Sequence, residues 1–182
     1  TPHGEVVVGY MGRLAAEKQV TDLSVLADLP GTRMVIIGDG PMREELEAQL
    51  PNAVFVGMKT GDDLPQYLAS LDLFVHPGEL ETFGQAIQEA QASGLATIAP
   101  RRGGPIDLIE PSHNGWLYSP GDLADLRHRV VDLVGDDFKR ASFGRTARAR
   151  VENRTWPQIS DQLLDHYWAA IELGVKAPVR IA

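Results

Sequence analysis

The sequence predicts an α/β domain built on an open, mostly parallel sheet of six strands with helices on both faces. Short apolar runs recur at regular intervals, and most of them are followed by a helical pattern. The runs are rich in Val, Ile, Leu and Phe and do not alternate with polar residues, which is typical of strands covered on both faces. Gly and Pro punctuate the junctions, and right-handed crossovers are therefore expected between the strands.

The predicted strands, in chain order, are the apolar runs themselves: "EVVVGYMG" (5–12), "TRMVIIG" (32–38), "AVFVG" (53–57), "LDLFVHP" (71–77), "LATIAP" (95–100) and "NGWLYS" (114–119). The predicted helices or helical turns lie between them: "EKQVTDLSVLADL", "GPMREELEAQL", "DDLPQYLASL", "GQAIQEAQASG" and "GPIDLIE". Gly94 is a natural stop for the fourth of these helices. The alternation predicts a Rossmann-like sheet.

After Asp122 the pattern predicts only helices. The first is "DLADLRHRVVDLVGD", the second lies near 136–154, and the third runs from Pro157 to about Leu173. The third helix has an apolar stripe made of Ile159, Leu163, Leu164, Tyr167, Trp168 and Ile171. This stripe is expected to pack on the same domain, with a different domain as the alternative.

Composition places residues 1–182 in one globular domain, because 43% of them are hydrophobic and no apolar run approaches the roughly 20 residues that span a bilayer. The absence of cysteine removes disulfides and thiolate metal sites, and the cytoplasm is the expected location. A net charge of −8 argues against nucleic-acid binding. The basic segment 145–154 predicts a solvated helix face; its alternative is peripheral contact with anionic lipid at the inner face of the plasma membrane.

The loop after the first predicted strand carries two cations beside a glycine: Gly12, Arg13 and Lys18 in "GRLAAEK". In open α/β sheets, ligands bind outside the carboxyl ends of the strands. Arg and Lys beside a flexible backbone suit a diphosphate, and an exposed pair near a helix start is the alternative interpretation. No G-x-G-x-x-G fingerprint follows this strand and no P-loop is present, which disfavours a dehydrogenase.

The stretch "ELETFGQAIQEA" (79–90) places Glu81 and Glu89 on either side of a predicted helix start at Phe83 and Gly84. Backbone N–H groups at such a start can receive phosphate oxygens. The two carboxylates would repel a phosphate, but each suits a pair of sugar hydroxyls. A sugar, a diphosphate and a ribose in that order make a nucleotide sugar. The alternative leaves Glu81 on a loop surface and Glu89 as an ordinary helix residue.

Taken together, these motifs resemble those of the retaining, two-domain (GT-B) glycosyltransferases of family 4. The resemblance rests on E-x7-E with an intervening Phe-Gly, G-R-x4-K after the first strand and G-x-G-P after the second, and it covers the chain from about Glu5 to Trp168. It is strongest to the actinobacterial GDP-mannose-dependent α-mannosyltransferases of glycolipid and lipomannan assembly. The chain would then form one half of a GT-B fold, a single nucleotide-sugar-binding domain.

The resemblance implies roles for the matching residues. Arg13 and Lys18, beside Gly12, would hold the diphosphate and stabilise the departing GDP, and Glu81 would contact hydroxyls of the transferred sugar. The Phe83–Gly84 backbone would lie alongside the sugar, and Glu89 would hold the ribose diol. The base would lie near Val56, Gly57, Met58 and Lys59. One departure is Gly78, where many relatives carry Ser.

The implied activity is transfer of mannose from GDP-mannose to a glycolipid or mannoside acceptor, with an α bond formed because the leaving diphosphate takes the acceptor's proton on the same face. No metal and no cofactor are expected, since the two cations can replace a metal. Family members carry an N-terminal acceptor-binding domain of similar size, which is missing from these 182 residues, so the isolated domain is expected to be inactive.

Two other functions fit the sequence. A retaining glucosyltransferase of the same fold that uses UDP- or ADP-glucose would share every motif. A non-catalytic α/β module, such as a receiver-like domain, would bind no nucleotide. A receiver would also need an acidic cluster at the end of the first strand, where this chain has Arg13.

Overall fold

The computed structural model of the chain describes residues 4–176 and contains one sheet of six strands. All five neighbouring strand pairs are parallel, in the order β3-β2-β1-β4-β5-β6. The strands are β1 (Val6–Met11), β2 (Thr32–Ile37), β3 (Val54–Gly57), β4 (Leu73–Val75), β5 (Ala96–Pro100) and β6 (Gly115–Tyr118). The predicted sheet and all six strands are confirmed.

Helical segments follow each of the first five strands, as predicted. They are the two 3-10 helices η1 (Ala16–Lys18) and η2 (Val20–Leu26), followed by α1 (Arg43–Gln49), α2 (Asp63–Ala69), α3 (Gln85–Ala92) and α4 (Pro105–Leu108). The first connection is not one regular α-helix, because the backbone of Gln19 adopts a left-handed conformation (φ 49°) that interrupts it. The chain ends with α5 (Leu123–Val134), α6 (Asp137–Val151) and α7 (Trp156–Lys176).

Two hydrophobic clusters cover the two faces of the sheet. Side chains of β1 alternate between them: Val8 and Tyr10 belong to one cluster, Val7 and Met11 to the other. The first cluster also takes in residues of η2, α1 and α5, and the second takes in residues of α2, α3 and α4. Burial on both faces explains why the strand sequences do not alternate.

Helices α5 and α6 are fixed at their starts by side-chain caps. Asp122 accepts a hydrogen bond from the N–H of Asp125, and Asp136 accepts one from the N–H of Lys139. Helix α6 then packs closely against the chain just before β5, because Gly144 allows its backbone to approach. A Cβ at Gly144 would lie 2.0 Å from the carbonyl oxygen of Gly94.

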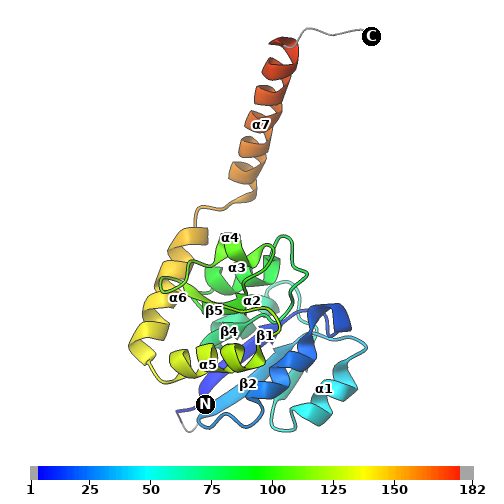
Figure 1. Cartoon of the computed structure of the whole chain (residues 1–182), viewed down its shortest axis with the longest axis vertical. Coiled ribbons are helices and arrows are strands. Elements are labelled where there is room, and N and C mark those ends of the chain that lie inside the picture. The colour runs from blue at the N-terminus through cyan, green and yellow to red at the C-terminus, as the bar shows by residue number, and fades with distance from the viewer. Residues whose placement is uncertain (1–3, 177–182) are drawn as a thin grey trace.

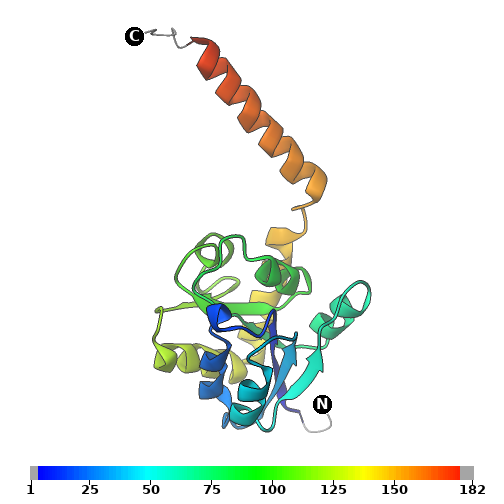
Figure 2. The same cartoon turned by 90° about the vertical axis from the view of Figure 1, so that its right-hand side faces the viewer.

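Helix α7 stands away from the rest of the chain in both views (Figures 1 and 2). The expectation that its apolar stripe packs on this domain is therefore wrong. Leu163, Leu164, Tyr167, Trp168 and Ile171 are all half or more exposed. Amphipathic periodicity identified the stripe correctly, but periodicity cannot specify which surface covers it.

We predict that Gly144→Ala lowers the stability of the chain markedly, whereas Gly174→Ala does not. The methyl group at position 144 would clash with the backbone of Gly94, while position 174 has open space around it. Overpacking of this kind costs about 1–3 kcal/mol, and an exposed helical Gly→Ala change gains up to about 1 kcal/mol. Chemical denaturation of both variants measures the difference. Equal free energies of unfolding would contradict the close packing of α6.

Candidate functional site

The strand order of the sheet locates a crevice at the carboxyl end of β1. The chain runs outward from β1 through β2 to β3, and then returns to the other side of β1 to build β4, β5 and β6. The connections on the two sides therefore diverge, and the general rule for open α/β sheets places a ligand-binding crevice at this point, between the loops after β1 and β4. The two loops that sequence analysis singled out, 12–18 and 78–84, are these loops.

Lys18 and Glu81 form an ion pair across this crevice. The Lys18 Nζ lies 2.9 Å from Glu81 Oε2, and the two side chains are 30% and 16% exposed. The other carboxylate oxygen, Oε1, accepts a hydrogen bond of 3.1 Å from the N–H of Gly84. Sequence analysis assigned Lys18 and Glu81 to different parts of a ligand, and the structure brings them into direct contact.

The surroundings of Glu81 keep its carboxylate ionised. Partial burial by itself would raise the pKa of Glu81, but the hydrogen bonds from Lys18 and from the N–H of Gly84, with the positive charge of Lys18, outweigh it. The net effect is a lowered pKa. The N–H of Gly84 thus donates to Glu81, whereas the sequence led us to expect it to face a phosphate.

His76 lies beneath this ion pair and was not identified from the sequence as a site residue. Its ring is 3% exposed, stacks on Tyr10 with 6.4 Å between ring centroids, and has Nε2 3.6 Å from Glu81 Oε2. Neither ring nitrogen has a hydrogen-bond partner. Burial lowers the pKa of His76, the negative charge of Glu81 raises it, and the positive charge of Lys18 lowers it; the resulting pKa is about 4. The ring is therefore neutral at pH 7.

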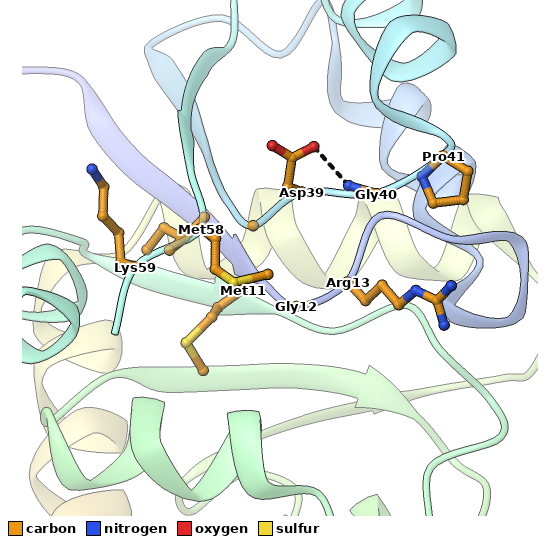
Figure 3. Close-up of a pocket in the computed structure, with 10 residues that line it drawn as sticks. Met11, Gly12, Arg13, Asp39, Gly40, Pro41, Met58 and Lys59 are labelled. Carbon is orange, nitrogen blue, oxygen red and sulfur yellow. Dashed lines mark hydrogen bonds between the residues drawn. The ribbon is translucent and has the colours of Figure 1, made fainter. Parts of the chain in front are cut away.

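A cavity of about 500 Å³ opens beside the loop after β1 (Figure 3). It collects residues from the loops after β1, β2 and β3, namely Met11, Gly12, Arg13, Ile37, Gly38, Asp39, Gly40, Pro41, Met58 and Lys59. Gly12, Arg13, Met58 and Lys59 were predicted to lie in the site, and the structure places them around one hollow. Its volume suits a small organic ligand.

The "GDGP" turn has a packing role at this cavity. A Cβ at Gly38 would lie 1.9 Å from the carbonyl oxygen of Gly12, and one at Gly40 would lie 2.4 Å from that of Leu14. Backbone hydrogen bonds of 2.9 Å from Leu14 to Asp39 and from Met42 to Leu14 join the two loops. These glycines are therefore required because one loop lies directly on the other.

The side chains of Arg13, Val56 and Lys59 have different neighbours. Arg13 is exposed and pairs with Glu17 at 3.4 Å. Val56 packs against the core cluster on the α2 and α3 face and does not line the cavity. Lys59 extends over the ring of Tyr67, with its Nζ 4.7 Å from the ring centroid.

Phe83 and Glu89 border a second, smaller hollow of about 200 Å³ between α3 and the start of α7. Glu89 accepts a hydrogen bond of 2.8 Å from the side chain of Gln85, one turn earlier in the helix. Glu89 also lines a hollow of about 490 Å³ between α2 and α3, next to Leu64 and Leu68. Its carboxylate therefore lies on a helix face that a ligand can reach, apart from the Lys18–Glu81 pair.

A group of polar residues that the sequence did not reveal joins the loops around the crevice. Gln19 and Glu79 exchange two hydrogen bonds, Glu79 N–H to Gln19 Oε1 at 2.7 Å and Gln19 Nε2 to Glu79 Oε1 at 3.3 Å. Arg102, from the loop after β5, lies 2.8 Å from Glu79. Because these residues come from three separate loops, no local spacing could have associated them.

Across residues 4–176, no group of three or more His, Cys, Asp or Glu side chains is arranged to hold a metal ion. Within the same residues, no helix has both the length and the apolar character that crossing a bilayer demands.

Solved structures share this architecture. HepE from Anabaena, crystallised in complex with UDP, superimposes with a TM-score of 0.80 at 28% identity, over 92% of this chain and 49% of that one. Sucrose-phosphate synthase from Thermosynechococcus elongatus gives a TM-score of 0.84 at 25% identity, over 95% of this chain and 47% of that one. The predicted fold, half of a GT-B glycosyltransferase, is confirmed.

Sequence relatives agree with the structures. The GDP-mannose-dependent alpha-mannosyltransferase of Mycobacterium tuberculosis is 46% identical over 93% of this chain and 44% of its own length. The protein of the same name from Corynebacterium glutamicum is 44% identical over 95% of this chain and 42% of its own. The chain thus spans less than half the length of these relatives. The profile of the family described as "Glycosyl transferases group 1" matches residues 1–150, and the chain belongs to this family.

Proposed function

We propose that this chain is the donor-binding part of a retaining α-mannosyltransferase that uses GDP-mannose. The observation that carries the proposal is the identity of 44–46%, over 93–95% of the chain, to proteins named for that activity. The match extends over nearly the whole chain. The donor is therefore proposed to bind in the crevice between β1 and β4.

The geometry supports this placement. The cavity beside Met58 and Lys59 accepts the nucleoside, and the adjoining loop supplies Arg13 and Lys18 for the diphosphate. Glu81, ionised and held by Lys18, faces the end of the donor that carries the sugar. Glu89, on α3, is proposed to hold the ribose diol.

The chemistry follows from where negative charge develops. When the glycosidic bond to the diphosphate breaks, the leaving group gains charge, which Arg13 and Lys18 stabilise. The leaving oxygen takes the proton of the acceptor hydroxyl on the same face of the sugar, and the α configuration is retained. Lys18 then exchanges part of its contact with Glu81 for the diphosphate. The two cations take the part that a metal ion plays elsewhere, so we expect no metal requirement.

The acceptor, a glycolipid or a mannoside, is proposed to reach the site from a domain outside these 182 residues. Peripheral membrane contact, if it occurs through this chain, suits the exposed basic face of α6 at Arg145 and Arg148. Helix α7 suits it less, because Asp161, Asp165 and Glu172 accompany its apolar stripe. A cytoplasmic location remains a prediction.

A glucosyltransferase that uses UDP-glucose is the second candidate, because HepE was crystallised with UDP on the same fold. Titration of the chain with GDP-mannose, in competition with GDP, UDP and ADP, separates the two.

We predict weak binding of GDP-mannose, and we predict that GDP competes with it at least about 10-fold better than UDP or ADP does. We also predict no transfer to a mannoside by these 182 residues alone, because they span less than half the length of the curated relatives and the positioning of two substrates supplies much of the barrier reduction. A preference for UDP, or no nucleotide affinity at millimolar concentration, would contradict the proposal.

We predict opposite effects for the two acids. Glu81→Gln should weaken GDP-mannose binding by about 10-fold and should not weaken GDP binding, because within the donor only the sugar contacts this carboxylate and loss of its charge frees Lys18 for the diphosphate. Glu89→Gln should weaken both ligands, because both contain the ribose. Glu45→Gln is the matched control, since Glu45 also accepts a hydrogen bond from a glutamine one turn away, Gln49, on α1. Calorimetry with both ligands measures the pattern, and the same pattern in the two site variants would show that the acids are misassigned.

We predict that His76→Phe makes the stability of the chain less sensitive to acid. The pKa of His76 is about 4 in the folded chain and about 6.5 when unfolded, so its contribution is fully present above pH 6.5 and is lost as the pH falls towards 4. The loss between pH 7.5 and 5 is roughly 2 kcal/mol. Denaturation at both pH values compares the variant with the exposed control His113→Phe. An unchanged pH dependence in His76→Phe would mean that the ring is not buried neutral.

A further inference from the structure

Gln19 has a backbone conformation that its residue type disfavours. Within residues 4–176, Gln19 (φ 49°) and Ser112 (φ 69°) are the only residues other than glycine with a positive φ. The Cβ of an ordinary residue crowds the backbone in this left-handed region, so glycine is favoured there. A glycine at position 19 would adopt the same conformation without strain. What distinguishes glutamine at this position is its side chain.

The side chain of Gln19 forms a two-point clamp on Glu79. Its amide oxygen accepts from the Glu79 N–H at 2.7 Å, and its amide nitrogen donates to the Glu79 carboxylate at 3.3 Å. Both donor and acceptor capacities of the amide are thus used on one residue, 60 positions away in the sequence. Glu79 is only 15% exposed, and its other carboxylate oxygen binds Arg102.

The clamp lies next to the ion pair at the centre of the site. Lys18 immediately precedes Gln19, and Glu81 follows Glu79 by two residues. The left-handed turn at Gln19 ends the 3-10 helix that carries Lys18, and the clamp fixes the loop that carries Glu81. On its far side that loop is held by the N–H of Gly104, which donates to the carbonyl oxygen of Glu81 at 2.7 Å.

We propose that Gln19 is a positioning residue for the donor site. Its side chain holds the loop of residues 78–84 against the loop after β1, so that Glu81 meets the sugar of the donor in a preorganised position. The proposal rests on the proposed function. It does not make Gln19 a catalytic residue, because Gln19 acts on the donor only through Glu81.

The proposal predicts a selective effect on the sugar. The diphosphate and the nucleoside are proposed to be held by Arg13, Lys18 and the cavity beside Met58, which belong to the connections after β1, β2 and β3, whereas the clamp holds the loop after β4. Glu81 does depend on it. Loss of the clamp should therefore weaken GDP-mannose binding and leave GDP binding nearly unchanged.

The test compares Gln19→Gly and Gln19→Ala with the wild-type chain by calorimetry and thermal denaturation. Both variants should lose about 10-fold in affinity for GDP-mannose, with less than about a 3-fold change for GDP. Gln19→Gly should keep its Tm within about 3 °C, because the strain is removed together with the hydrogen bonds. Ser112→Gly is the matched control: it relieves the same kind of backbone strain far from the crevice and should change neither affinity.

A rescue experiment distinguishes positioning from general damage. Gln19→Glu alone places two carboxylates against each other and should lose GDP-mannose affinity. Combining it with Glu79→Gln restores a carboxylate–amide pair with the roles reversed, and the Glu79 backbone N–H keeps its acceptor. The double variant should recover affinity to within about 3-fold of wild type.

A measurement without ligand tests the clamp itself. The backbone amide of Glu79 should exchange with solvent at least about 10-fold faster in Gln19→Gly than in wild type, with shift changes at Gly84 in NMR spectra. Two outcomes would overturn the inference and leave the proposed function standing. One is wild-type GDP-mannose affinity in both Gln19 variants, and the other is an unchanged exchange rate of the Glu79 amide in Gln19→Gly. Equal losses for GDP and GDP-mannose with a lowered Tm would show a merely structural role and also overturn it. A wild-type chain that binds no nucleotide sugar would overturn the proposed function, and with it the role of Gln19 in donor binding.

Discussion

The ion pair between Lys18 and Glu81 closes the crevice that the strand order creates, and the other features of the site depend on it. It joins the loop after β1 to the loop after β4, the two loops at which the connections of the sheet diverge. Each partner neutralises the charge of the other, so both can be partly buried. Lys18, a cation that suits a diphosphate, and Glu81, a carboxylate that suits sugar hydroxyls, therefore lie side by side. In the proposed donor complex, recognition of the phosphates and recognition of the sugar are therefore coupled, because a ligand that attracts Lys18 also changes the surroundings of Glu81.

Close approach of backbones makes this arrangement possible. Gly38 and Gly40 let the loop after β2 lie on the loop after β1, and Gly104 lets the loop after β5 lie on the loop that carries Glu81. A Cβ at any of these positions would meet a carbonyl oxygen at less than 2.5 Å. The loops thus form one connected layer above the carboxyl edge of the sheet, and their polar side chains are held by neighbouring loops. This layer explains glycines that would otherwise be assigned to ligand contact alone.

Cations near the proposed site offset the negative net charge of the chain, which would otherwise repel an anionic donor. The net charge is −8, yet the cavity beside β1 is bordered by Arg13 and Lys59, and Lys18 lies in the adjacent crevice. At physiological ionic strength the influence of a charge falls off over roughly 8 Å, so nearby cations outweigh distant exposed acids. The neutral state of His76 contributes to this balance, because a buried positive charge beside Lys18 would compete for Glu81.

The amino-acid sequence was sufficient to predict the sheet, its six strands and the loops in which the site is proposed. Apolar runs and Gly-Pro punctuation are local signals, and uninterrupted apolar runs indicate strands that are buried on both faces. The sequence also led to the prediction that Arg13, Lys18, Glu81 and Glu89 are site residues, since charged residues in or just after the loops at strand ends stand out in an apolar pattern. The folded structure was needed to show that Lys18 pairs with Glu81, that Glu89 lies on a separate helix face, and that the stripe of α7 is exposed. It alone revealed His76 and the clamp of Gln19 on Glu79. These contacts join residues that are distant in the chain, and their geometry depends on how close the loops come, which no spacing in one segment encodes.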